Sequence, residues 1–343
     1  MKTAVVVCPG RGTYNKTELG YLGRHFQDRA LLQQFDAIRG HCGQETLSAL
    51  DGAERFSVNL HTRGDNASAL IYAATIGDFA EIDFGKVNVV AITGNSMGWY
   101  SALACGGAIG PVAGFQLANT MGTLMQTSLI GGQLIHPFVG EDWMPNSARR
   151  AELLELVRSI NDRAGHVLDL SIDLGGMLVL AGNEAGLKAF EAAVEPEQGR
   201  YPMRLPNHAA FHTHLQEPVA EAGREAIDPG TFGQPTRPLI DGRGKIWWPG
   251  STDSARLYEY TLGDQVTTAY DYTRAIIVAA REFAPDLFII TGPGGTLGGA
   301  TAQALIMANW RGLGSREDFR DRQVNDPLLV SMGFEDQRAK VTA

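Results

Sequence analysis

Cysteine is scarce in this sequence, and the three that occur, Cys8, Cys42 and Cys105, have no paired spacing that would suggest a disulfide framework or a zinc site. A long run of lysine or arginine is also missing, so nothing offsets the net charge of -9. This balance argues against broad nucleic-acid binding and requires an acidic partner to dock on a local basic patch. The few cysteines without paired spacing fit a reducing compartment, so we expect the protein to be cytoplasmic.

Long apolar runs are missing as well. The stretch from Ser101 to Ala118 carries little charge, but several glycines, a proline and Gln116 interrupt it. A membrane span needs about 20 predominantly apolar residues, so none is expected. The apolar run Ala4–Cys8 ends at once in Pro9-Gly10, which indicates a first strand and not a secretory signal.

Three apolar runs, Ala4–Val7, Val87–Ile92 and Leu287–Ile290, each end in a glycine-containing turn. Runs bounded by turns and followed by helical patterns predict buried parallel strands of an α/β sheet. Ligands of such sheets bind beyond the carboxyl ends of the strands, so the three turns are the candidate walls of an active site.

The pattern of predicted helices and strands changes between residues 127 and 205. A helix, two strands and a second helix are predicted there, at 152–160, 167–172, 177–180 and 185–194. This run is typical of a small α+β insertion. We therefore predict a catalytic core from residues 1–126 and 206–310, a small subdomain at 127–205, and a charged, partly disordered peripheral tail at 311–343.

Gly94-Asn95-Ser96-Met97-Gly98 fits the Gly-x-Ser-x-Gly pattern of a nucleophile elbow. The pattern alone is weak, but a good strand precedes it and a small-residue helix at 99–106 follows it, as the motif requires. The alternative is that Ser96 only caps this helix. The context favours Ser96 as a nucleophile.

A serine nucleophile needs a base for its proton and donors for the oxyanion that forms on the substrate. His208, His212 and His214 are candidate bases; as a zinc site they lack an acidic or cysteine partner at a matching spacing. The backbone N–H of Met97 lies at the start of the helix, where negative charge is favoured, and the turn at 9–12 is a plausible second donor.

The turn Gly292-Pro293-Gly294-Gly295 could cradle a phosphate, but it lacks the Lys-Ser/Thr of a P-loop and the acidic residue of a dinucleotide site. We interpret it as a structural turn.

Taken in order, four segments resemble the malonyl-CoA:acyl-carrier-protein transacylase family and the acyltransferase domains of polyketide and fatty-acid synthases. Pro9–Thr13 is similar to the opening Pro-Gly-Gln-Gly-Ser/Thr of that family, and Gly94–Gly98 to its Gly-His-Ser-x-Gly. Ala210–Thr213 resembles the Ala-Phe-His-Ser segment, and Gly292–Gly294 the late Gly-Pro-Gly. The resemblance covers roughly residues 4–309.

This resemblance implies an α/β-hydrolase-like core with a parallel sheet and an inserted ferredoxin-like subdomain. It selects His212 as the base of Ser96, with the backbone amides of Met97 and Arg11 as the oxyanion hole. It also implies that a backbone carbonyl near residues 265–268 orients His212, so that no triad carboxylate is required.

The implied activity is a ping-pong acyl transfer from a CoA thioester to the phosphopantetheine thiol of an acyl carrier protein. No permanently bound cofactor and no metal are expected. Basic side chains near the groove between the subdomains would dock the acidic carrier; the candidates are Arg149, Arg150, Lys188, Arg200 and Arg204.

The acyl pocket departs from the family pattern. Malonyl-specific members have an arginine where this chain has Met121, and a histidine where it has Asn95. Met121 beside Phe211 would leave a buried carboxylate unpaired, so we predict an acyl group without a free carboxylate. The side chain of Arg11 is the alternative source of a positive charge.

Two other functions stay open on the sequence alone. Members of the family that lack the same arginine include hydrolases that edit acyl carrier proteins, and a non-catalytic docking module is a third possibility. Intact Ser96 and His212 argue against the last of these.

Overall fold

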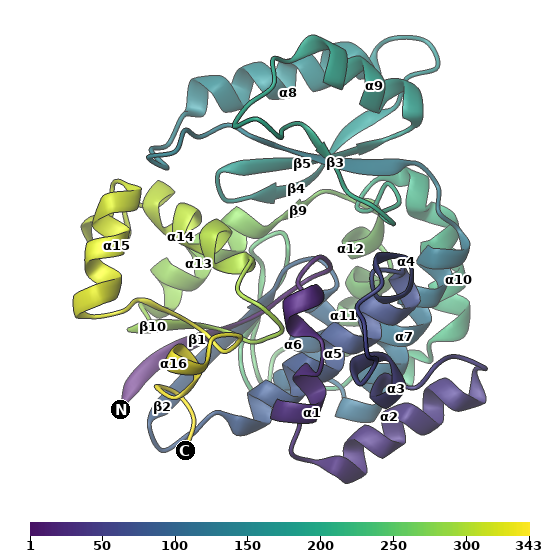
Figure 1. Cartoon of the computed structure of the whole chain (residues 1–343), viewed down its shortest axis with the longest axis vertical. Coiled ribbons are helices and arrows are strands. Elements are labelled where there is room, and N and C mark those ends of the chain that lie inside the picture. The colour runs from purple at the N-terminus through teal and green to yellow at the C-terminus, as the bar shows by residue number, and fades with distance from the viewer.

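The computed structural model describes residues 1–343, and the three apolar runs form the middle of its main sheet (Figure 1). β1 (Lys2–Cys8) lies between β2 (Val87–Gly94) and β10 (Leu287–Ile290), parallel to both. β11 (Leu329–Ser331) continues the sheet beyond β10; β7 (Leu239–Ile240) and β8 (Ile246–Trp247) continue it beyond β2. Helices cover both faces, which explains why the buried parts of the central strands are apolar on both sides.

The helices of the larger domain surround this sheet. α5 and α7 pack against each other along their length, and nearly every residue of α5 is buried, consistent with its lack of a polar face. The helices before the insertion are α1 (Tyr21–His25), α2 (Arg29–His41), α3 (Leu47–Asp51), α4 (Val58–His61), α5 (Gly64–Glu81), α6 (Gly98–Cys105) and α7 (Pro111–Thr127). Those after it, up to the last strand, are α10 (Glu217–Ala226), α11 (Ser254–Leu262), α12 (Asp264–Thr267), α13 (Tyr272–Phe283), α14 (Leu297–Met307) and α15 (Arg316–Asn325).

The second sheet forms the small subdomain at the top of Figure 1. Its order is β6-β3-β5-β4-β9, and α8 (Ser147–Asn161) and α9 (Glu184–Ala193) cover its outer face. Its own strands are β3 (Gly132–Pro137), β4 (Leu168–Leu174), β5 (Met177–Gly182) and β6 (Met203–Arg204). The element order βαββαβ with this strand order is the predicted ferredoxin-like arrangement. The predicted fold class is confirmed.

The two sheets are tied together by β9 (Tyr270–Asp271), which comes from the larger domain yet pairs with β4. Beside this junction, the Thr273 hydroxyl donates a 2.5 Å hydrogen bond to the buried carboxylate of Asp173. Arg150 binds the other oxygen of that carboxylate. The boundaries predicted for the two domains remain an interpretation of the sequence.

The segment 311–343 is not the partly disordered tail that its charged sequence predicts. Its strand β11 completes one edge of the main sheet, and α16 (Glu335–Arg338) follows it. Arg338 forms an ion pair with Asp78, a carboxylate that also accepts a hydrogen bond from Tyr21. The prediction failed because the apolar residues of this segment that pack into the core are scattered or form only the short run Leu328–Val330 among many charges.

No helix in the structure has both the length and the apolar character needed to cross a membrane.

Candidate active site

Ser96 and His212 are 116 residues apart in the sequence, but their side chains meet between the two subdomains. Ser96 Oγ lies 2.7 Å from His212 Nε2. On the far side of the imidazole, Nδ1 lies 2.7 Å from the backbone carbonyl oxygen of Gln265. A proton on Nδ1 satisfies that carbonyl and leaves Nε2 as an acceptor for the serine hydroxyl. The arrangement is a dyad oriented by a backbone carbonyl.

The turn that carries Ser96 is a tight connection from β2 to α6. Ser96 has φ 55°, a left-handed conformation that a non-glycine residue adopts only when its surroundings enforce it. A Cβ added to Gly98 would collide with the carbonyl oxygen of Cys8, and one added to Gly94 would collide with the backbone of Gly98. The two glycines of the motif therefore permit the close approach that exposes the serine.

His212 is held as firmly as the serine. Its backbone also has positive φ, 57°, and its N–H donates to the carbonyl of Val266. The imidazole is 4% exposed, and its ring lies 5.4 Å from that of Tyr270. Burial lowers the pKa of His212 to about 4, although the hydrogen bond to Gln265 opposes this shift. The imidazole is therefore neutral at pH 7, the form that accepts a proton.

Two backbone N–H groups beside Ser96 have no partner within the protein. Neither the N–H of Met97 nor that of Arg11 donates a hydrogen bond to another residue. Met97 precedes the first turn of α6, where the helix dipole favours negative charge. The turn with Arg11 lies against the elbow, since a Cβ on Gly10 would meet the carbonyl of Asn95 at 2.5 Å. Both positions suit donors to an oxyanion.

The side chain of Arg11 braces the loop before the histidine. Its Nη2 donates to the carbonyls of Thr62, at 2.9 Å, and Asn207, at 2.7 Å. The guanidinium lies 5.4 Å from the ring centre of Phe211, while Nε and Nη1 are buried without a partner. Burial lowers the pKa of Arg11 to about 10, so the group remains charged at neutral pH.

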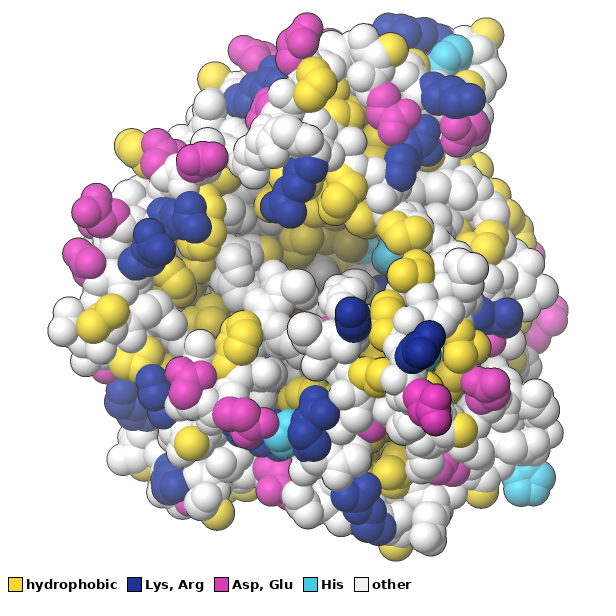
Figure 2. Space-filling view, viewed as in Figure 1, with side chains coloured by type: hydrophobic (Ala, Val, Ile, Leu, Met, Phe, Trp, Pro, Cys, Tyr) yellow, Lys and Arg dark blue, Asp and Glu magenta, His cyan; other side chains and the backbone are white.

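A cavity of about 650 Å³ opens over Ser96, between the main sheet and the small one. Figure 2 shows it as a hollow with apolar side chains inside and lysine or arginine side chains around it. Three of the predicted substrate-binding residues, Asn95, Phe211 and Arg11, line it. Met121 does not: its side chain is fully buried, and its sulfur faces Gly223 of α10. The predicted place of Met121 in the pocket wall is therefore wrong.

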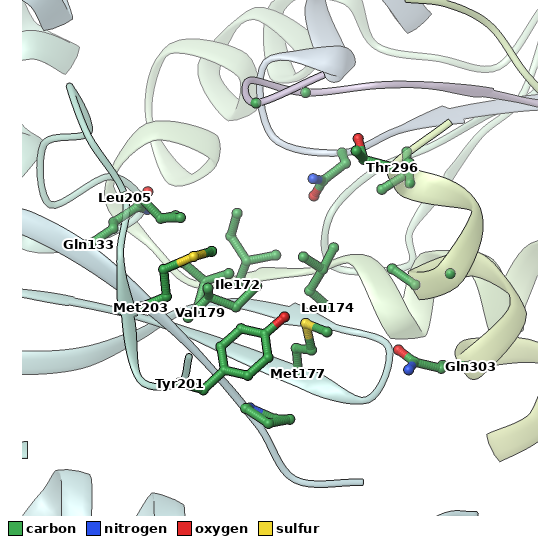
Figure 3. Close-up of a pocket in the computed structure, with 18 of the residues that line it drawn as sticks. Gln133, Ile172, Leu174, Met177, Val179, Tyr201, Met203, Leu205, Thr296 and Gln303 are labelled. Atoms are coloured by element: carbon green, nitrogen blue, oxygen red, sulfur yellow. The ribbon is translucent and has the colours of Figure 1, made fainter. Parts of the chain in front are cut away.

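Several site residues escape sequence reasoning. The carbonyl of Gln265 lies within the range 265–268 expected to orient His212, but the role of its side chain was not foreseen: it donates to the carbonyl of Ser96 at 3.0 Å and accepts from Tyr100 at 3.1 Å. Much of the cavity wall comes from the inner face of the small sheet (Figure 3). No short motif marks either feature. Only the alternation of apolar residues in β3 to β5 could have indicated a second apolar face.

The three clustered histidines point to different partners. His208 lines the cavity, with Nδ1 2.9 Å from the carbonyl of Pro206, and His214 lies 3.6 Å from Asp169. Nowhere in the structure do three His, Cys, Asp or Glu side chains gather as a metal site.

Four of the five basic residues predicted to dock a carrier are already paired with acids. Arg149, Arg150, Lys188 and Arg204 form ion pairs. Arg200 has no acidic partner and lines the cavity mouth, as does Arg316 of α15, which the sequence analysis missed.

No protein-family model matches the chain. A comparison with curated proteins finds the malonyl CoA-acyl carrier protein transacylase of Salmonella typhimurium, 25% identical over 214 residues. That match covers 61% of this chain and 64% of the Salmonella protein, so it spans less than two thirds of the relative's length.

Solved structures match along nearly the whole chain. The malonyl-CoA:acyl carrier protein transacylase of Xanthomonas oryzae has a TM-score of 0.77 at 17% identity, over 99% of this chain and 97% of that one. A malonyl-transacylase solved in complex with a type II polyketide synthase acyl-carrier protein has a TM-score of 0.73 at 19% identity, over 100% and 99% of the two chains. These structures show that the fold is shared.

Proposed function

We propose, on the premise that this chain resembles the malonyl-CoA:acyl-carrier-protein transacylase family in both sequence and fold, that it is an acyl-CoA:acyl-carrier-protein S-acyltransferase. The observation that carries the proposal is the 2.7 Å contact between Ser96 Oγ and His212 Nε2 beneath an open cavity. A docking module without catalysis would have no need of a strained serine paired with a neutral base.

The proposed reaction has two halves. Ser96 Oγ attacks the thioester carbonyl carbon of an acyl-CoA while His212 Nε2 takes the hydroxyl proton, and the N–H groups of Met97 and Arg11 bind the oxyanion. The C–S bond then breaks, and the CoA thiolate takes the proton from His212. In the second half, a phosphopantetheine thiol of the carrier gives its proton to His212 and its sulfur attacks the acyl-serine carbonyl. The bond between Ser96 Oγ and the acyl carbon then breaks, and Oγ takes the proton from His212, which restores the serine and the neutral base.

The proposed acyl group lacks a free carboxylate. Arg11, the basic side chain beside Ser96 and Phe211, uses Nη2 on two loop carbonyls while its other nitrogens are enclosed by protein. The cavity wall beyond Ser96 is mostly apolar or uncharged. A carboxylate there would lose its hydration without gaining a counter-ion.

Docking of the carrier would use the unpaired arginines of the cavity mouth, Arg200 and Arg316. One belongs to the small subdomain and the other to the C-terminal segment, so both could attract the phosphate of an arm that enters the cavity.

The test is intact-protein mass spectrometry after incubation with a panel of acyl-CoAs. We expect an acyl adduct on the wild-type protein, none on Ser96→Ala, and release of the adduct to holo-carrier protein. Rapid appearance of free acid without a carrier would instead identify a hydrolase, and the absence of any adduct from every thioester would contradict the proposal.

A further inference from the structure

The inner face of the small sheet carries a row of apolar side chains that crosses four strands. Met203 of β6 is the register partner of Ile135 on β3, Ile135 is the partner of Val179 on β5, and Val179 is the partner of Ile172 on β4. Neighbouring strands are about 4.8 Å apart, so the row is roughly 14 Å long. Pro137, Met177 and Leu174 form a second row beside it in the same way.

The two faces of this sheet are covered differently. On the outer face, Leu134, Leu178 and Leu180 have no exposed surface and pack under α8 and α9. On the inner face, Met203 is 38% exposed and Ile135 is half-buried, although both are apolar. All members of both inner rows line the cavity over Ser96. Leu174 and Met177 of the second row are also partly exposed, whereas Ile172 and Val179 are only 7% and 2% exposed and belong to the main hydrophobic core. The apolar surface open to the cavity therefore lies mainly at Met203, Ile135, Leu174 and Met177, and such surface inside a concave site is typical of a ligand pocket.

Figure 3 shows how these side chains lie relative to the rest of the cavity. Ile172, Val179 and Leu174 occupy its middle, with Met203 and Leu205 toward one end and Gln303 at the other. Thr296 faces them from the larger domain, to which Ser96 also belongs. An acyl chain attached to Ser96 thus has apolar side chains of both rows to lie against.

We propose that this surface selects the acyl group: an unbranched apolar chain of medium length, lying across β4, β5, β3 and β6. A chain of about ten carbons matches the row, because an extended C–C bond of about 1.5 Å advances the chain by roughly 1.3 Å. This inference rests on the proposed function and makes it specific. It assigns Ile135 and Met203 as specificity-determining residues.

The pantetheine arm is the other candidate occupant of this surface. That arm carries two amides and a hydroxyl, whose hydrogen bonds would go unmade against Met203, Ile135 and Val179. Gln303 and Gln133 lie at the two ends of the cavity in Figure 3, and Tyr201, beside Met177, is the polar side chain labelled nearest to the rows. A methylene chain loses nothing by contact with the row and gains from leaving water.

The experiment measures kcat/KM for acylation of Ser96 by acetyl-, butyryl-, octanoyl-, decanoyl- and malonyl-CoA, each below its micellar concentration. Burying a methylene is worth at most about fourfold, so we expect decanoyl-CoA to exceed acetyl-CoA by at least about tenfold. A rate that does not depend on chain length, or is highest for malonyl-CoA, would overturn the inference while leaving the acyltransferase proposal intact. No acylation by any donor would instead overturn the proposed function.

Two variants locate the effect. Ile135→Trp, which fills the middle of the row, should lower kcat/KM for decanoyl-CoA about tenfold or more and change that for acetyl-CoA by less than about threefold. Met203→Trp, at the exposed end of the row, makes the same test without altering a buried position. Val324→Trp is the matched control, because Val324 is 83% exposed on α15. Equal losses for acetyl- and decanoyl-CoA would place the pantetheine arm on the row and sink the inference.

Discussion

His212 is buried, and its low pKa has a direct consequence for the pH dependence of the reaction. Because burial lowers this pKa to about 4, the neutral base predominates throughout the range from pH 6 to 8. We expect kcat/KM for acylation of Ser96 to be flat there and to fall only below about pH 5. A pH profile with a stable acyl-CoA measures this; an acid limb near pH 6.5 would mean that the imidazole is solvated.

The same group affects stability in a defined direction. Its pKa is lower in the folded chain than the ordinary value of 6.5, so the unfolded chain binds more protons between these two values. The free energy of unfolding should fall as the pH drops from about 6.5 toward 4, by at most roughly 1.4 kcal/mol per pH unit from this residue. Urea titrations of the wild type and His212→Gln at several pH values separate the contribution of His212 to this pH dependence from that of the carboxylates.

At the level of elements, the elbow depends on the contact between α6 and β1. Gly98→Ala would push a methyl group against the carbonyl oxygens of Cys8 and Pro9, and backbone atoms cannot move aside cheaply. We expect a loss of about 1–3 kcal/mol in the free energy of unfolding, together with loss of the acyl adduct. Gly40→Ala in α2 is the control, since a Cβ there meets nothing within 4 Å and should not destabilise.

The elements that sequence reasoning recovers are those with a strong local signal. The strands at 4–7 and 287–290 are buried on both faces and therefore continuously apolar, the strand at 87–92 departs from this only at the exposed Asn88, and the glycine turns mark their ends. β7, β8 and β9 have two residues each, too few for any periodicity to show. β11 was missed for a related reason: its neighbours in the chain are charged, and only pairing with β10 makes it a strand.

The residues of the site likewise fall into those that a local motif predicts and those that only the tertiary structure brings together. The resemblance selects Ser96 and His212, because the residues beside each follow a motif. Which side chains form the acyl wall depends on how the small sheet is placed over the elbow, and no local pattern encodes that placement. Met121 illustrates the difference: its place in the family pattern suggested the pocket, but its side chain turns toward Gly223.

For the whole molecule, the ion pair between Arg338 and Asp78 ties the last helix to the core. Both side chains are nearly or fully buried, so Arg338→Met would leave an uncompensated carboxylate beside Tyr21. We expect a loss of about 3–5 kcal/mol in the free energy of unfolding, measured by denaturant titration. Arg322→Met, which breaks the exposed pair with Asp326, should cost less than about 1 kcal/mol. Similar small losses in both variants would show that the C-terminal segment is dispensable.

β9 also constrains how the cleft can move. This strand of the larger domain is hydrogen-bonded into the small sheet, and Thr273 next to it binds Asp173. The two domains that enclose the cleft are therefore connected through the backbone of β9. A wide hinge motion of the small subdomain would have to break the pairing between β9 and β4. A long flexible acyl chain would therefore have to enter the cleft lengthwise from its open end. The width of the cleft would be set before the chain binds.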